Sequence, residues 1–194
     1  MARGPGIRVI GGSVRGRRLR QVPGEGTRPI SNRVRESLFN IIGADIVDAS
    51  MLDLFGGTGS VGIEALSRGA QRVTFVEIQA RAVETIRANL SATGLQARAS
   101  VVQTDAFAYL KRRNVEPVDY VYIAPPQYRE LWKKALAALD AHTGWLAADG
   151  WAIVQMHPGE YEGLHLSHVR EFDQRKYGNT LLCFYERIEG GGDL

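Results

Sequence analysis

From residue 51 onward, short runs of apolar residues alternate with segments whose apolar positions recur at helical spacing. The apolar runs predict five strands, at residues 51–55, 72–77, 98–103, 120–124 and 151–156. The segments between them predict helices, at residues 60–68, 80–90, from about 106, and 130–141. Nearly continuous apolar strands separated by helices are typical of a parallel sheet that is covered on both faces.

The end of the chain departs from this alternation. Residues 165–172 and 180–186 predict two strands that are joined by a turn at residues 176–179, with no helix between them. We therefore expect a mostly parallel, seven-stranded sheet that ends in an antiparallel hairpin. This is the α/β, Rossmann-like architecture.

Before the alternation, apolar residues recur at i, i+4, i+7 and i+8 from Val34. They predict an amphipathic helix whose N-cap is Ser31 or Asn32. Further upstream, β-branched and leucine residues alternate with arginines and glycines between Val9 and Val22. This pattern predicts an N-terminal β-hairpin.

The N-terminal segment is strongly basic. Residues 1–35 hold nine arginines and one glutamate, a net charge of +8, so the rest of the chain carries −5 of the total of +3. A run of like charges is usually a solvated tail, and that is the alternative interpretation. Arginine, however, forms bidentate contacts with phosphate, and a structured basic hairpin on an acidic domain indicates a nucleic-acid-binding face.

We therefore expect residues 1–30 to form an RNA-binding extension and residues 31–194 to form the main domain. The arginines expected to contact RNA phosphates are Arg8, Arg15, Arg17, Arg18, Arg20 and Arg33.

The composition excludes several classes of protein. The single cysteine, Cys183, excludes an intrachain disulfide and a cysteine-rich zinc site, and the four histidines lack the spacing of metal ligands. No apolar stretch approaches the roughly 18 residues that a membrane span requires, and the N-terminus lacks a secretory signal. We expect a cytoplasmic, monomeric protein with no metal and no membrane contact.

A glycine-rich segment at residues 53–59 follows the first strand of the alternation and opens a helix. Its glycines, Gly56, Gly57 and Gly59, let the backbone turn sharply and approach a ligand closely. Taken alone, the segment fits a nicotinamide-binding turn, a methyl-donor site or merely a tight connection.

Two further carboxylates narrow these alternatives. Glu77 ends the second strand, where an acid accepts hydrogen bonds from ribose hydroxyls, and Asp105 follows the third, within reach of an adenine amino group. Together with Asp53 they would line one crevice at the carboxyl ends of three successive strands. A nicotinamide site accounts for Glu77 but not for Asp105, so the pattern favours a methyl donor, S-adenosylmethionine.

The segment after the fourth strand, residues 124–128, reads Ala-Pro-Pro-Gln-Tyr. Its two prolines, Pro125 and Pro126, remove two N–H donors and leave their carbonyl groups free to accept hydrogen bonds. An aromatic ring at Tyr128 suits stacking on a planar base. A Pro-Pro pair also marks ordinary loops, but its place after the fourth strand favours a substrate site.

Several motifs together resemble the RsmD family, the 16S rRNA guanine-N2 methyltransferases. The resemblance extends over nearly the whole chain and rests on residues 9–12 (Val-Ile-Gly-Gly), 15–17 (Arg-Gly-Arg), 26–29 (Gly-Thr-Arg-Pro), 33–36 (Arg-Val-Arg-Glu), 53–59, and 177–179 (Tyr-Gly-Asn). The combination is specific, although each motif alone is shared with many methyltransferases.

The resemblance implies S-adenosylmethionine as cofactor and ribosomal RNA, free or within the small subunit, as substrate. It implies that residues 124–128 hold a flipped guanine, and that Arg28 reaches the methionine carboxylate or an RNA phosphate. The remaining cofactor contacts that it implies are Asp53, Phe55, Gly56, Gly57, Thr58, Gly59, Glu77, Ile78, Asp105 and Ala106.

The sequence departs from the family at Ala124, where the motif normally has Asp or Asn. That side chain accepts a hydrogen bond from the target amine, which alanine cannot do; the Pro125 carbonyl and the Gln127 amide oxygen remain as acceptors. Ala124 leaves open a non-catalytic protein that binds S-adenosylmethionine and RNA during ribosome assembly. A DNA adenine-N6 methyltransferase is a further alternative, because its Asp/Asn-Pro-Pro-Tyr motif is closely related.

Overall fold

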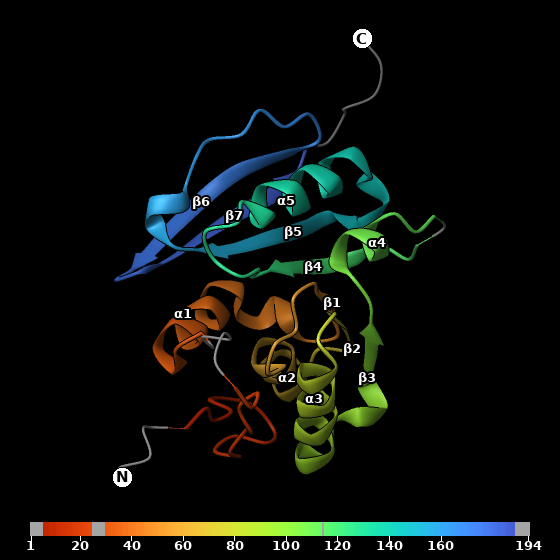
Figure 1. Cartoon of the computed structure of the whole chain (residues 1–194), viewed down its shortest axis with the longest axis vertical. Helices are drawn as coiled ribbons and strands as arrows, with labels where there is room; N and C mark the ends of the chain where they lie inside the picture. Colours follow the sequence, from red (N-terminus) through yellow and green to blue (C-terminus); the bar gives the residue numbers. More distant parts are fainter. Residues whose placement is uncertain (1–5, 25–29, 114, 189–194) are drawn as a thin grey trace.

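The computed structural model describes residues 6–24, 30–113 and 115–188. Arg28, expected at the cofactor or the RNA, lies outside these described residues. Among them, seven strands form one sheet in the order β3-β2-β1-β4-β5-β7-β6 (Figure 1). The strands are β1 (Ser50–Asp53), β2 (Arg72–Glu77), β3 (Ala99–Gln103), β4 (Val118–Ile123), β5 (Leu146–Met156), β6 (Val169–Tyr177) and β7 (Thr180–Arg187).

The first five strands run parallel, whereas β7 pairs antiparallel with both β5 and β6. The helices are α1 (Asn32–Ile42), α2 (Ser60–Ser67), α3 (Ala80–Thr93), α4 (Ala106–Leu110) and α5 (Leu131–Ala141). The mostly parallel sheet with an antiparallel terminal hairpin confirms the predicted fold class. None of the described helices is both long and apolar enough to cross a membrane.

Two hydrophobic cores lie on opposite faces of the sheet. The first packs α1, α2 and α3 against one face, and the second packs α4 and α5 against the other. Side chains alternate between them along each strand: Tyr120 and Tyr122 of β4 belong to the first core, and Val121 and Ile123 to the second. Both faces of β4 are therefore buried, which explains its continuous apolar sequence.

Local signals set the ends of α1. The Ser31 hydroxyl accepts a hydrogen bond from the Val34 N–H at 3.3 Å, which makes Ser31 the N-cap. The helix ends at Gly43, whose φ of 66° is a left-handed conformation that favours glycine.

The sequence placed two strands imprecisely. The strand predicted at residues 165–172 is β6, Val169–Tyr177, and the turn contains only Gly178 and Asn179. The reason is that β6 is an edge strand with exposed polar residues, so its extent depends on its pairing with β7 and not on hydrophobicity. Similarly, β5 begins at Leu146, because Leu146 pairs with Val118 of β4.

The N-terminal β-hairpin is shorter than predicted, with a single antiparallel bridge between Arg8 and Arg18. Much of its backbone is bound by helix side chains, which prevents a longer ladder. Glu64 of α2 accepts hydrogen bonds from the N–H groups of Ile10 and Gly11, both at 2.8 Å. We call residues 7–20 the N-terminal arm.

The arm packs closely on the domain. Ile7, Val9 and Leu19 are buried in the first core. At Gly12, where φ is 75°, an added Cβ would lie 1.8 Å from the Ser67 carbonyl oxygen, so only glycine fits this approach. The arm is therefore held in a fixed position on the domain. The division of the chain into an RNA-binding extension (residues 1–30) and a main domain (residues 31–194) stays a prediction.

Candidate active site

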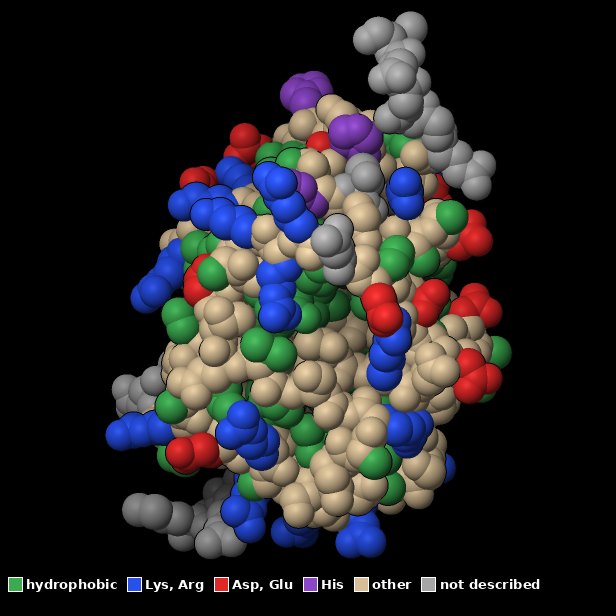
Figure 2. Space-filling model, turned by 90° about the vertical axis from the view of Figure 1, so that its right-hand side faces the viewer, with side chains coloured by type: hydrophobic (Ala, Val, Ile, Leu, Met, Phe, Trp, Pro, Cys, Tyr) green, Lys and Arg blue, Asp and Glu red, His purple; other side chains and the backbone are tan. Residues whose placement is uncertain are grey.

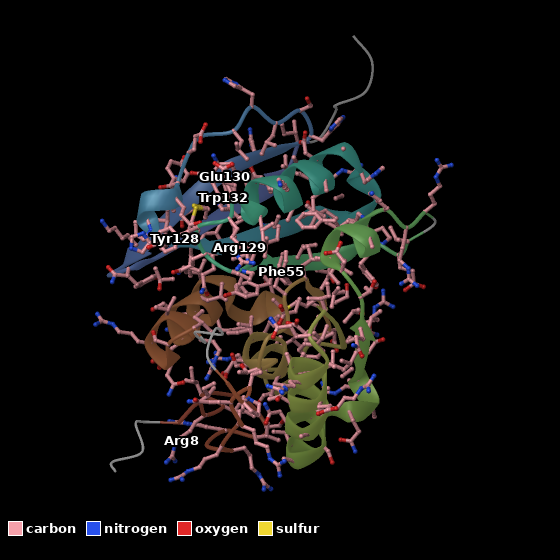
Figure 3. All side chains as sticks on the ribbon, in the orientation of Figure 1. Arg8, Phe55, Tyr128, Arg129, Glu130 and Trp132 are labelled. Atoms are coloured by element: carbon pink, nitrogen blue, oxygen red, sulfur yellow. The ribbon has the colours of Figure 1, made fainter. Side chains whose placement is uncertain are left out.

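A cavity of about 620 Å³ lies at the carboxyl ends of the parallel strands. Strands that run parallel end at the same edge of the sheet, so loops that are distant in sequence meet there. Phe55, which follows β1, and Arg129, which follows β4, both line the cavity and lie near the middle of the molecule (Figure 3).

The glycine-rich segment forms one wall of the cavity. The Gly56 N–H donates to the Val76 carbonyl oxygen at 3.0 Å, and the Gly59 N–H donates to that of Gly56 at 2.7 Å. Gly57 and Gly59 have φ values of 53° and 74°. A Cβ added to Gly56 would lie 2.8 Å from the Ile86 side chain, so the loop is close-packed behind as well as sharply turned.

The Glu77 carboxylate lines the cavity and holds this loop. One oxygen accepts from the Gly57 N–H at 2.9 Å, and the other accepts from the Gln79 N–H at 2.8 Å. Since a carboxylate oxygen has a further lone pair, Glu77 can still accept hydrogen bonds from a ligand.

Asp53 lies deeper, with an exposed fraction of 2%, and its Oδ1 atom has no hydrogen-bond partner among the described residues. Burial, reinforced by the charge of Glu77, raises the pKa of Asp53 to about 7. An unpartnered buried acid that lines a cavity suits a polar or cationic group of a ligand, since such a group would stabilise its ionised form.

Asp105 lines the cavity just after the end of β3, as predicted. Its carboxylate is the N-cap of α4 and accepts from the Ala108 N–H at 2.9 Å. The rings of Phe55 and Phe107, which line the same cavity, meet edge to face with centroids 6.4 Å apart. This part of the cavity therefore offers an acid next to an apolar wall, which suits an adenine ring.

Most of the predicted cofactor residues line this one cavity: Asp53, Phe55, Gly56, Gly57, Thr58, Glu77, Ile78 and Asp105. Gly59 and Ala106 do not line it. Gly59 is the N-cap of α2, and the Ala106 side chain is buried in the second core.

The Pro-Pro segment forms the opposite wall. Ala124, Pro125, Pro126 and Gln127 line the cavity, whereas Tyr128 is 70% exposed at its rim. Tyr128 has a φ of 60°, and its N–H donates to the Glu160 carboxylate at 2.6 Å. A carboxylate from the connection after β5 thus fixes the loop that follows β4.

Several residues that line the cavity are not among those predicted from the sequence. They include Tyr122 on β4 and Gln155 on β5. They also include Arg129 and Leu131, which follow the Pro-Pro segment in the sequence. Arg129 follows the predicted segment directly, so its charge was an available signal. Gln155 had no such signal, because it lies on another strand.

The six arginines predicted to contact RNA are all exposed. Lys and Arg side chains gather at the lower end of the molecule, where the arm and α3 lie, with few acidic side chains among them (Figure 2). Arg8 lies at this lower end, away from Tyr128 at the cavity (Figure 3). A nucleic acid bound to both would extend along the molecule.

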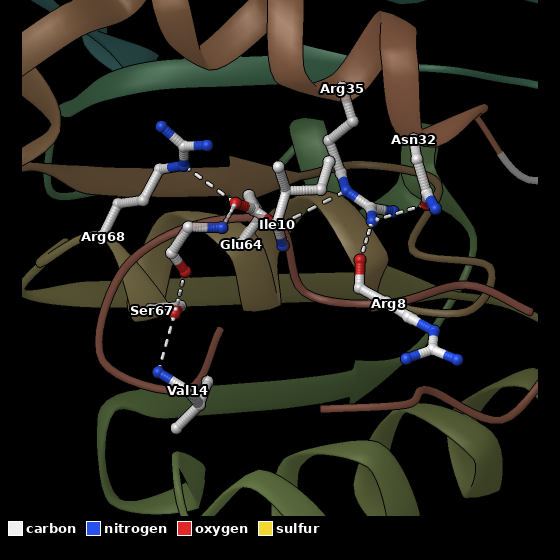
Figure 4. A network of polar contacts seen from close by, with 9 residues as sticks. Arg8, Ile10, Val14, Asn32, Arg35, Glu64, Ser67 and Arg68 are labelled. Atoms are coloured by element: carbon white, nitrogen blue, oxygen red, sulfur yellow. Dashed lines mark hydrogen bonds and ion pairs between the residues drawn. The ribbon is translucent and has the colours of Figure 1, made fainter. Parts of the chain in front are cut away.

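Arg35, the ninth arginine of the basic segment, does not belong to this surface. Its side chain is fully buried, it donates to the Arg8 carbonyl oxygen, and its Nε lies 3.5 Å from Glu64 (Figure 4). The same Glu64 carboxylate accepts from Arg68 at 2.8 Å. Arg35 therefore holds the arm in place and does not present its charge to a ligand.

A second buried side chain ties the arm to the cofactor loop. Asn89 of α3 is fully buried, accepts from the Arg20 N–H at 2.7 Å and donates to the Arg20 carbonyl oxygen at 3.1 Å. It also donates to the Thr58 carbonyl oxygen at 2.9 Å. The basic arm and the glycine-rich wall are therefore joined through a single amide.

The chain matches the family model described as Conserved hypothetical protein 95 over residues 7–186. It belongs to this family. The relatives below confirm the resemblance of its motifs to the RsmD family.

The chain is 39% identical over 158 residues to "Putative rRNA methyltransferase YlbH" of Bacillus subtilis, covering 80% of this chain and 85% of the relative. It is also 39% identical over 149 residues to "Ribosomal RNA small subunit methyltransferase D" of Escherichia coli K12, covering 77% and 74%. These similarities agree with the family assignment.

Solved structures agree with the fold. "Putative methyltransferase yhhF from Escherichia coli" superposes with a TM-score of 0.82 at 34% identity, covering 93% of this chain and 97% of that one. An RNA methyltransferase from Salinibacter ruber, in complex with S-adenosyl-L-homocysteine, has a TM-score of 0.64 at 17% identity, covering 84% and 95%. The family member described here has the class I methyltransferase fold.

Proposed function

We propose that this protein transfers a methyl group from S-adenosylmethionine to the N2 amine of a guanine in small-subunit ribosomal RNA. The observation that carries the proposal is one cavity with two unlike walls. A glycine-rich wall with acids suits a nucleoside cofactor, and a Pro-Pro wall beside an exposed tyrosine suits a base. The relatives named as rRNA methyltransferases support the choice of RNA.

The glycine-rich wall fits S-adenosylmethionine, which supplies its methyl group from a sulfonium centre when bound. Asp53 and the glycine loop would hold the methionine end, and Glu77 would accept hydrogen bonds from the ribose hydroxyls. Asp105 and the backbone at Ala106 would bind adenine against the apolar wall that includes Ile78. The methionine end of S-adenosylmethionine carries a cationic amino group, which needs a hydrogen-bond acceptor when it is buried. The unpartnered Oδ1 atom of Asp53 would be that acceptor.

The opposite wall would hold the base. A guanine within a helix hides its amine, so the target must be unpaired or flipped into the cavity. The Pro125 carbonyl oxygen would accept one hydrogen bond from the amine, and Tyr128 would stack on the base at the rim. The amine is neutral before attack, so orientation is the main requirement and its proton leaves afterwards to water.

The arm would bind the RNA backbone around the target. Its exposed arginines lie at a distance from the cavity, so they would contact phosphates of an extended RNA and not the target base. All of these groups come from one chain, so we propose that the protein acts as a monomer. We further propose that it acts in the cytoplasm, on RNA that is either free or part of the small subunit.

The decisive test is transfer of labelled methyl groups to small-subunit RNA, and to small-subunit particles, that lack the modification. Mass spectrometry of the digested nucleosides would identify the product. We expect N2-methylguanosine at one site. Methylated adenine in DNA would instead support the DNA alternative, and methylation at another atom would contradict the guanine-N2 assignment.

Ala124 favours a second candidate, a binding protein without catalysis that serves ribosome assembly. Its methyl side chain faces the cavity and offers no acceptor for an amine. Calorimetric binding of S-adenosylmethionine together with no turnover on any form of the RNA would support this second candidate over the enzyme.

A further inference from the structure

Orientation of an amine requires two acceptors. The guanine amine has two N–H bonds, and its nitrogen lone pair faces a methyl donor only when both N–H bonds point elsewhere. At the Pro-Pro wall, the Pro125 carbonyl oxygen can accept one of them. Since Ala124 has no polar side-chain atom, a second acceptor must come from another residue that lines the cavity.

The strand register brings Gln155 beside Ala124. Tyr122 and Ile123 of β4 pair with Ile153 and Val154 of β5, so the next residues along each strand, 124 and 155, lie side by side. Side chains alternate along both strands, so positions 124 and 155 face the same side as Tyr122. Both residues line the cavity.

Tyr122 fixes the orientation of this amide. Its hydroxyl donates to the Oε1 atom of Gln155. Tyr122 is 2% exposed, and burial together with the charge of Asp53 raises its pKa well above the usual value. The hydroxyl therefore stays protonated and keeps donating. An amide oxygen has two lone pairs, so Oε1 retains one acceptor position for a substrate.

Gln127, the other amide of this wall, differs in its setting. Gln127 is exposed, whereas Gln155 is partly buried between two strands. An acceptor that is fixed before the substrate arrives loses less entropy when it orients the amine. The contrast between these two side chains favours Gln155.

We propose that Gln155 accepts a hydrogen bond from the target amine and is the catalytic acceptor of this site, with Tyr122 as its positioning residue; this inference rests on the proposed function. One N–H of the amine donates to Gln155 Oε1 and the other to the Pro125 carbonyl oxygen. The nitrogen lone pair forms the bond to the methyl carbon, while the carbon–sulfur bond breaks and leaves its electron pair on sulfur. The positive charge passes to the nitrogen, which then releases one proton to water, because a neutral amide cannot accept it.

The test compares two glutamine variants in single-turnover methyl transfer. Gln155→Met keeps the length of the side chain but removes the acceptor, and Gln127→Met makes the same change at the competing amide. Exposed Gln71→Met, before β2 and outside the cavity lining, is the matched control. We expect Gln155→Met to slow transfer by about ten- to a hundredfold, with the dissociation constants of S-adenosylmethionine and RNA within about twofold of wild type. We expect Gln127→Met to slow transfer less than Gln155→Met, because the exposed Gln127 amide is not fixed before the substrate arrives.

Two further variants distinguish orientation from general damage. Gln155→Glu retains an acceptor oxygen beside Tyr122, so it should transfer faster than Gln155→Met. Tyr122→Phe should slow transfer by about three- to tenfold without weakening cofactor binding. If Gln155→Met does not fold, as judged by its melting temperature, Gln155→Ala takes its place.

The outcomes separate this inference from the proposed function. A wild-type protein that forms no N2-methylguanosine overturns the proposed function and the inference with it. An active wild type whose Gln155→Met variant is equally fast overturns the inference alone. Loss of rate in Gln127→Met but not in Gln155→Met would likewise overturn it, and would assign the role to Gln127.

Discussion

The two walls of the cavity differ in how they are held. The cofactor wall, at the ends of β1 and β2, is closed by main-chain hydrogen bonds and by the Glu77 carboxylate, around a glycine loop with no space behind it. The substrate wall, after β4, is largely exposed. Tyr128 in this wall and Glu130 just after it have φ values of 60° and 53°, and the Glu160 carboxylate holds the backbone of Tyr128.

This difference corresponds to what each wall must do. A cofactor of constant shape is best bound by a site that is already formed, because little entropy is then lost on binding. A base that belongs to a large RNA must enter and leave, so its wall has to remain accessible. We therefore expect changes on one wall to affect one ligand, and the following predictions test that separation.

The largest effect is expected at Glu77. Glu77→Ala removes the acceptor for Gly57, Gln79 and the ribose, and should weaken S-adenosylmethionine binding by about 1–3 kcal/mol, which is about 5- to 150-fold in Kd. RNA affinity should remain unchanged. Calorimetry on this variant, with exposed Glu84→Ala on α3 as the control, checks it. An unchanged cofactor affinity would remove Glu77 from the site.

The basic arm should affect RNA alone. Replacing Arg15, Arg17 and Arg18 with glutamine should weaken RNA binding by about tenfold and flatten its salt dependence by about 0.7 to 0.9 per lost phosphate contact. The control replaces Arg112 and Arg113, which are exposed in the connection between α4 and β4. Binding and slope equal to wild type would mean that the arm is only a solvated surface. A loss of cofactor affinity would instead show coupling through Asn89.

The raised pKa of Asp53 predicts that S-adenosylmethionine binding depends on pH. With a pKa of about 7, its ionised fraction rises about eightfold between about pH 6 and 7.5, and S-adenosylmethionine affinity should rise with it. Asp53→Asn should bind more weakly and lose this rise. Without cofactor, protonated Asp53 contributes to the free energy of unfolding. This contribution is fully present at pH values below the ordinary pKa of 3.8 and is lost as pH rises through the raised pKa of about 7. A wild-type affinity independent of pH would contradict the assignment.

The smallest effect is expected at Glu160. Glu160→Ala frees the Tyr128 backbone and should lower kcat/KM for RNA by about two- to fivefold, while S-adenosylmethionine affinity stays the same. Glu162→Ala removes a neighbouring exposed carboxylate that binds Lys133, and serves as the control. Equal kinetics in the two variants would mean that the Glu160 contact does not position the loop.

Much of the cofactor wall could be predicted from the sequence because its signals are local. Glycines follow a strand and open a helix, and Glu77 and Asp105 follow directly on apolar runs. Parallel strands end at one edge, so these residues had to meet once the alternation of strands and helices was recognised. The cap at Ser31 and the turn at Gly178 are local signals of the same kind.

Only the tertiary structure decided which distant side chains complete the site. Gln155 lies beside Ala124 because β4 and β5 pair in one register, and a shift of one residue would turn its side chain to the other face. Glu64 binds the arm across 53 and 54 residues of sequence, and Glu160 binds Tyr128 across 32. Local residue patterns determine elements and their ends, whereas contacts between elements depend on strand register and on packing across the whole sheet.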